Sequence, residues 1–279
     1  MFLILAAVTI GKSQNPDPSF SPEDLKIFGE LMRGLDSIPA GPLGKTTIAV
    51  GELFLGTPYV ASTLESEGQE RLVVNLRGLD CTTFVENVVV IARMKFEGNG
   101  DWETYLKNLE RIRYREGRLL GYPSRLHYFT DWIRDNEGKG LVRDITREIG
   151  GVAVVKELNF MGTHPERYPA LGTKSHLEQV RAIEANLSAM PLFVLPTEEV
   201  VRREELLRDG DIIALATDIK GLDVTHTGIA LTGTDGRIHL LHASTDGAVT
   251  ITEEPLSDYL KKISRNAGVI VVRPLEPGR

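Results

Sequence analysis

The residue with the clearest chemical potential in this sequence is its only cysteine, Cys81, in the segment GLDCTTFVENVVVIARMKF (residues 78–96). Asp80 is of a type that caps helices, and an apolar run with helical spacing follows the thiol. These features predict a helix over residues 82–96, with the sulfur at its N-terminus. The helix macrodipole is positive at that end, so a reactive thiolate is favoured there. The competing interpretation is a small buried apolar residue, a common role of free cysteine.

Two histidines near the C-terminus are suited to act with this thiol, because a cysteine nucleophile needs a base and the base needs an orienting group. His226 begins a β-prone run, HTGIAL, 145 residues after the cysteine, and His242 ends another, RIHLLHA. A hairpin pairing 226–232 with 237–243 would bring both imidazoles together, since they lie away from the turn at TDGR. His242 could then hold one ring nitrogen of His226 while the other faces Cys81.

A zinc site is the alternative use of the same ligand types. Zinc accepts atoms of the kinds carried by Cys81, Asp223, His226, His239 and His242. However, His239 and His242 are three residues apart in a predicted strand, so they face opposite sides of it. The sequence therefore favours cysteine chemistry over a metal site, and His239 is predicted to be structural.

The elements that must position these residues come as helices first and strands last. Besides 82–96, helices are predicted after the capped start at Ser21 and over 45–55, 101–113, 124–135, 175–189 and 255–264, with a weaker signal over 197–207. The segment 150–172 is predicted to be a strand followed by a loop. Short β-prone runs then follow, namely GDIIALAT, HTGIALTG, RIHLLHAS, AVTITEE and GVIVVRP. This order predicts an α+β fold, with N-terminal helices packed on a C-terminal antiparallel sheet.

The net charge and the hydropathy of the sequence limit the kinds of partner that we expect for this protein. The net charge of −7 argues against a nucleic-acid partner, because phosphate binding needs a basic stripe. The apolar run 2–10 is far shorter than the ~20 residues of a membrane span, so stable membrane insertion is not expected. It fits the core of a secretory signal, although no basic residue precedes it and no A-x-A site follows; a frayed terminus is the alternative. We therefore divide the chain into a candidate signal or disordered segment, 1–20, and a single domain, 21–279.

Four motifs in order, GTPYV, DCTTFV, HTGIAL and HAST, resemble the NlpC-type cell-wall cysteine amidases. The resemblance covers roughly residues 20–273 and implies a papain-like fold with inserted helical segments. It implies that Cys81 is the nucleophile, His226 the base and His242 the orienting residue, and it places Tyr59 of GTPYV near the oxyanion. One departure is Thr-Thr after the cysteine, where the superfamily usually has Ser-Gly.

Longer segments, among them SRLHYFTDWIRDN (124–136) and NFMGTHPERYPAL (159–171), resemble one branch of that superfamily, formerly a domain of unknown function. The branch is associated with N-acetylmuramoyl-L-alanine amidase activity on turnover fragments of peptidoglycan. The resemblance implies cleavage of the amide between muramic acid and L-alanine through an acyl-enzyme, without a metal or organic cofactor. It also implies export, to the periplasm or cell envelope of a bacterium, with disaccharide-peptides as the partner.

Specificity is predicted to come from helical segments around 101–135 and 159–172, which would form a wall over the sugar side of the cleft. Arg125, His127 and Tyr128 are suited to bind a sugar and a carboxylate; packing and capping is their alternative role. Two other functions stay open: a γ-D-glutamyl-diaminopimelate endopeptidase, which cuts two residues further along the stem peptide, and a non-catalytic peptidoglycan-binding protein. The intact cysteine and histidines argue against the second.

Overall fold

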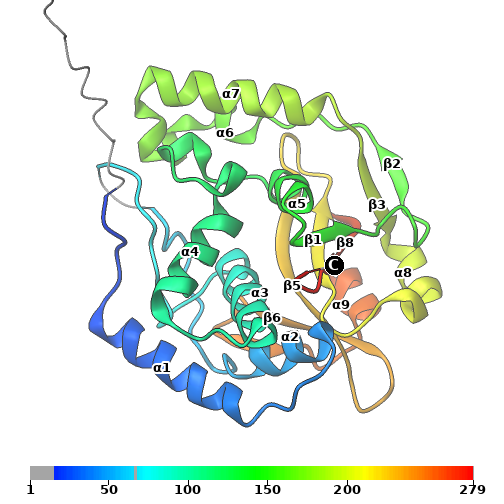
Figure 1. Cartoon of the computed structure of the whole chain (residues 1–279). Coiled ribbons are helices and arrows are strands. Elements are labelled where there is room, and N and C mark those ends of the chain that lie inside the picture. Colours follow the sequence, from blue (N-terminus) through cyan, green and yellow to red (C-terminus); the bar gives the residue numbers. More distant parts are fainter. Residues whose placement is uncertain (1–15, 66–67, 279) are drawn as a thin grey trace, which may run out of the picture.

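The computed structural model describes residues 16–65 and 68–278 (Figure 1). The candidate signal segment, 1–20, lies mostly outside these residues, so its role stays a prediction. Within the described part of the chain, no helix is both long enough and apolar enough to cross a membrane.

An antiparallel sheet forms the centre of the described chain, with strand order β2-β3-β8-β4-β5-β6-β7 and β1 paired with β8 (Figure 1). The strands are β1 (Val142–Asp144), β2 (Val152–Val154), β3 (Leu192–Pro196), β4 (Ile212–Thr217), β5 (Val224–Thr232), β6 (Ile238–Ala243), β7 (Val249–Ile251) and β8 (Asn266–Pro274). Most of the sheet comes from the C-terminal third of the chain. The predicted antiparallel sheet is therefore confirmed, with β1 and β3 as strands that the sequence patterns did not predict.

The helices that precede and cover this sheet follow the predicted order. They are α1 (Pro22–Asp36), α2 (Leu43–Glu52), α3 (Cys81–Glu97), α4 (Trp102–Arg113), α5 (Phe129–Gly138), α6 (Phe160–Thr163), α7 (Lys174–Ser188), α8 (Thr197–Arg203) and α9 (Leu256–Lys262). Single 3₁₀ turns lie at Arg115–Gly117, Tyr122–Ser124, Pro165–Arg167, Pro169–Gly172 and Glu204–Leu206. The α+β class is thus confirmed.

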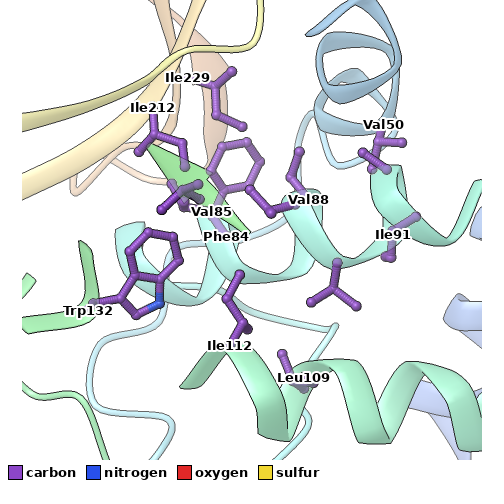
Figure 2. Packing of buried hydrophobic residues seen from close by; sticks show 14 of the residues in the cluster. Val50, Phe84, Val85, Val88, Ile91, Leu109, Ile112, Trp132, Ile212 and Ile229 are labelled. Carbon is purple, nitrogen blue, oxygen red and sulfur yellow. The ribbon is translucent and has the colours of Figure 1, made fainter. Parts of the chain in front are cut away.

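Both faces of the sheet are covered. In β4, Ile212 and Ala214 face a core built with α3, whereas Ile213 and Leu215 face a second core that α8 and α9 complete. All six residues of β4 are buried as a result, which explains why GDIIALAT is apolar without alternation. Figure 2 shows the first core, where Phe84 and other side chains of α3 meet Ile212 and Ile229 of the sheet.

An ion pair between α3 and α4 is buried in this core. Arg113 Nε of α4 lies 2.7 Å from Glu86 Oε2, and each residue is only 2% exposed. Arg113 also donates to the backbone oxygen of Val73 at 2.5 Å, which ties the segment before α3 to α4. Two charges so far from water are stable only when each satisfies the other, so the pair depends on both partners.

The predicted helix over 124–135 was wrong at its start, because α5 begins at Phe129. Pro123 lies in a 3₁₀ turn, and Arg125 is extended and forms an isolated antiparallel bridge with Tyr114. The start of α5 is stabilised from outside: Asp223 Oδ2 accepts hydrogen bonds from Thr130 N and Oγ1, each at 2.8 Å. That partner is 93 residues away in sequence, so local patterning could not place the helix start.

We expect Arg113→Met to lower the free energy of unfolding by about 3–5 kcal/mol, because Glu86 would stay buried without a partner. The double variant Glu86→Leu/Arg113→Met should recover most of that loss, since it removes both charges. Urea unfolding measures both. Lys26→Ala is the control, because its pair with Glu23 is exposed and should contribute under about 1 kcal/mol. Equal losses in the single and double variants would contradict the ion-pair argument.

Candidate active site

Cys81 is the first residue of α3, where the helix begins with a reciprocal capping box. Asp80 Oδ1 accepts from the backbone N–H of Thr83 at 2.8 Å, and Thr83 Oγ1 accepts from Asp80 N at 2.9 Å. Thr83 therefore has a structural task at the position where the resembled superfamily usually has glycine. Thr82 and Thr227 line the same pocket as Cys81, and both act to lower the pKa of its thiol, although burial raises it overall. The cysteine therefore lies between the start of α3 and β5.

The segment that carries Tyr59 joins the sheet edge to the start of α3. Tyr59 N donates to Gly247 O at 2.8 Å, in the turn between β6 and β7. On the other side, Val60 N donates to Leu79 O and Leu79 N donates to Pro58 O, each at 3.0 Å. Tyr59 is therefore placed between the sheet and the residues just before the cysteine. Burial, and then the negative charges that Cys81 would carry when ionised and that Asp80 carries, raise the pKa of Tyr59, so its hydroxyl keeps its proton and can donate.

His226 of β5 and His242 of β6 are hydrogen-bonded to each other, with His226 Nε2 2.6 Å from His242 Nδ1. The two rings are nearly perpendicular, at 88°. The register pairs Ile229 with Leu241, so the two histidines are diagonal neighbours on one face of the hairpin. Gly228 leaves room for this contact, because a Cβ there would lie 2.9 Å from His242 Cβ. The sequence analysis did not single out this glycine, although it stands two residues after His226.

The imidazoles are held neutral. Burial lowers the pKa of His226 to about 3, with a further contribution from the charge of His242, and burial lowers the pKa of His242 to about 4. Burial, followed by the charge of Asp80, raises the pKa of the Cys81 thiol. These effects outweigh the positive helix N-terminus, which on its own favours a thiolate. The expectation of a free thiolate is therefore corrected: the structure favours a neutral thiol beside neutral imidazoles.

Cys81 and His226 open onto a common pocket of about 90 Å³. The pocket is lined by Cys81, Thr82, Leu126, His127, Phe129 and residues 222–227. Its wall comes from three places: the start of α3, the segment that leads into α5, and the start of β5. The segment before α5, which the sequence analysis predicted to be helical, is extended here and so brings His127 to the pocket.

Of the three predicted substrate-binding residues, His127 lines this pocket, whereas Arg125 and Tyr128 have internal partners. Arg125 is 4% exposed and binds Leu64 O at 2.9 Å and Glu65 Oε1 at 2.5 Å. The Tyr128 hydroxyl donates to Glu184 at 2.7 Å. A role in binding substrate stays a prediction for all three, and the geometry favours it for His127.

Cys81, Asp223 and His226 line one pocket, but the five residues of types that bind zinc do not form a ligand set in the described part of the chain. Among the residues that the structure describes, no group of three or more His, Cys, Asp or Glu side chains is arranged to hold a metal ion. His239 instead bonds Thr252 O at 2.8 Å and lies 3.2 Å from Asp235, away from His242. Asp223 uses its carboxylate for Thr130 and for its neighbour Val224 N.

The sequence of this chain matches the model of a known protein family. The model of the AmiA-like family, described as N-acetylmuramoyl-L-alanine amidase-like, matches residues 49–269. The chain belongs to this family. The match includes Cys81, His226 and His242, and membership makes the protein an amidase-like hydrolase of a family directed at peptidoglycan-type material. A search of curated proteins gives no match.

Three solved structures are similar to this chain. An N-acetylmuramoyl-L-alanine amidase from Bacteroides uniformis is 36% identical, covers 85% of this chain and 100% of its own, and has a TM-score of 0.79. A putative xylanase from Bacteroides fragilis is 38% identical over 80% of this chain and 98% of its own, with a TM-score of 0.74. A Legionella pneumophila protein of the family DUF1460, at 18% identity, 90% and 95% coverage and a TM-score of 0.66, shares the fold. Placement in the wider NlpC-type superfamily stays a prediction.

We expect the free energy of unfolding to fall between pH 7 and pH 5. His127, His226 and His242 have folded-state pKa values of about 3, 3 and 4, below the unfolded value near 6.5, so the unfolded chain binds more protons as the pH falls. Each of these histidines should lower the free energy of unfolding by roughly 1–2 kcal/mol at pH 5 relative to pH 7. Urea unfolding at both pH values measures the change.

The control for this pH dependence is the double variant His226→Gln/His242→Gln, which removes two of the three titrating groups. Its stability should change less between pH 7 and pH 5 than that of the wild type. An identical slope in both proteins would mean that His226 and His242 have the same pKa values in the folded and unfolded states.

Proposed function

We propose that this AmiA-like protein hydrolyses the amide between the lactyl group of N-acetylmuramic or anhydromuramic acid and L-alanine in peptidoglycan fragments, with Cys81 as nucleophile. The observation that carries the proposal is the 2.6 Å bond between His226 Nε2 and His242 Nδ1, beside a cysteine at a capped helix start. The family match supports an amide as the class of bond that is cleaved. Export to the cell envelope is part of the proposal, because peptidoglycan fragments arise there.

The first half of the reaction transfers one proton and forms one bond. With Nε2 of His226 engaged by His242, its Nδ1 is the nitrogen available to take the proton from Cys81 Sγ. The sulfur attacks the lactyl carbonyl carbon, and the carbon–nitrogen bond then breaks. His226 gives the proton to the leaving L-alanine amine, which leaves a thioester on Cys81. The neutral thiol of Cys81 and the neutral imidazole of His226 are the forms that these steps require, because the thiol must give up a proton and the imidazole must accept it.

The second half returns the enzyme to its starting state. Water attacks the thioester while His226 takes one of its protons, the carbon–sulfur bond breaks, and His226 returns that proton to the Cys81 sulfur. The lactyl acid is released and loses its remaining proton to solvent. The negative oxygen in both steps needs donors. The Cys81 N–H lies in the first turn of α3, where it has no intrahelical acceptor, and the Tyr59 hydroxyl stays protonated.

Glycoside cleavage, the activity of a xylanase such as the putative one from Bacteroides fragilis, has less support in this chain. Most glycosidases use two carboxylates about 5–10 Å apart across the scissile bond. In the pocket beside Cys81, the one carboxylate in the lining is Asp223, and its oxygens bond Thr130 and Val224. The site therefore favours acyl transfer to a thiol.

The deciding experiment is mass spectrometry of products from a GlcNAc-anhydroMurNAc-peptide incubated with the wild type and with Cys81→Ala. We expect free disaccharide and intact stem peptide from the wild type, and neither from the variant. His239→Gln is the matched control, because His239 lies on the same strand as His242 and binds elsewhere. A cut between D-glutamate and diaminopimelate would instead indicate an endopeptidase, and no cleavage at all would favour a binding protein.

We expect Tyr59→Phe to lower kcat by about 10²-fold or more, because one donor to the developing oxyanion is lost. KM should change little, since the hydroxyl acts mainly on the transition state. Steady-state kinetics measure both, with the melting temperature as a check on folding. A kcat equal to that of the wild type would remove Tyr59 from the oxyanion site.

A further inference from the structure

The pocket beside Cys81 has a chemical pattern that the hydrolytic mechanism does not use. Its volume of about 90 Å³ has room for a group of a few heavy atoms, given that one water occupies ~30 Å³ in the liquid. The side chains of Leu126, Phe129, Leu222 and Val224 make part of the lining apolar. The group that enters this space should therefore be small and carry an apolar end.

His127 adds one polar requirement to that pocket. Its Nε2 lies 2.9 Å from Tyr122 O, and a carbonyl oxygen can only accept, so Nε2 must carry the ring proton. The Tyr122 ring also packs on the imidazole, with centroids 4.4 Å apart, which holds the ring in place. Burial and the neighbouring guanidinium of Arg125 lower the pKa of His127 to about 3, so the ring is neutral.

A neutral ring protonated at Nε2 leaves Nδ1 as a hydrogen-bond acceptor. No residue in the described part of the chain bonds His127 Nδ1, and His127 is half-buried and lines the pocket. A ligand group at this position must therefore offer an N–H or O–H. A carboxylate would place its lone pairs against that of Nδ1, so the predicted contact of His127 with a carboxylate is disfavoured.

We propose that this pocket receives the acetamido group of muramic acid, with its N–H donated to His127 Nδ1 and its methyl group against the apolar wall. The inference rests on the proposed amidase function. In muramic acid the acetamido group is on C2, next to C3, which carries the lactyl group, so it is close to the carbonyl that Cys81 attacks. A hydroxyl group could donate to Nδ1 but has no methyl for the apolar side. The N–H beside the methyl of L-alanine belongs to the scissile amide, so it must stay with the carbonyl that Cys81 attacks.

The test compares two substrates that differ only at this group: GlcNAc-anhydroMurNAc-peptide, and the same molecule with a free amine on the muramic acid. We expect the wild type to show a kcat/KM at least about tenfold lower for the free amine, from the loss of methyl burial and of a neutral hydrogen bond. Most of the difference should appear in KM, because the group does not react.

Two variants of His127 separate the acceptor from the structural bond. Glutamine places an amide N–H near the position of Nε2, so His127→Gln should keep the bond to Tyr122 O but lose the acceptor. Asparagine places an amide oxygen near the position of Nδ1, so His127→Asn should keep the acceptor. We expect His127→Gln to reduce kcat/KM about tenfold for the acetylated substrate and not for the free amine. We expect His127→Asn to keep more of the wild-type preference for the acetylated substrate than His127→Gln does.

Leu222→Phe provides an independent check if the His127 variants have lowered melting temperatures. The larger side chain would fill part of the pocket, so it should lower kcat/KM for the acetylated substrate more than for the free amine. The proposal is overturned if the wild type cleaves both substrates alike, or if His127→Gln lowers both equally. Neither result would touch the amidase function, which fails only if the wild type releases no stem peptide from either substrate or if Cys81→Ala still does.

Discussion

The burial of α3 between the sheet and the other N-terminal helices is the constraint on which the rest of the structure depends. Eleven of its seventeen residues are buried, including Glu86 and Asn87. A helix so enclosed cannot leave polar groups unpaired, because each would lose its water without a replacement. Arg113 therefore reaches Glu86, and Tyr105 donates to Asn87 at 2.5 Å. These bonds determine how α4 packs, and α4 in turn binds the segment before the cysteine.

The same burial explains the chemistry of the candidate site. The start of α3 lies against β5, so Cys81 is largely withdrawn from solvent and its pKa rises, while the pKa values of His226 and His242 fall. The free protein then holds a neutral thiol near two neutral imidazoles. Such a site is protected from unselective reaction, since the thiolate is the nucleophilic form.

Around this centre, segments that are distant in sequence act as positioning elements. Residues 57–60 pair with the β6–β7 turn on one side and with residues just before Cys81 on the other. Asp223, from the connection between β4 and β5, caps α5 and so leaves the segment before α5 extended. That extended segment carries His127 to the pocket. Cys81, His226 and the pocket wall are thus positioned by helices, strands and capping bonds, which hold side chains more precisely than loops do.

The sequence by itself determined the α+β order, the helix that begins at the cysteine, and the hairpin that brings His226 to His242. These follow from local capping, from alternation and from a turn, all of which act over a few residues. Three features were decided only by the tertiary structure: the start of α5, the protonation states of the cysteine and histidines, and the internal partners of Arg125 and Tyr128. Each depends on burial or on a partner more than fifty residues away, such as Asp223 for Thr130 or Glu184 for Tyr128. Local patterns contain no information about such partners, because desolvation and long-range capping exist only once the layers have packed.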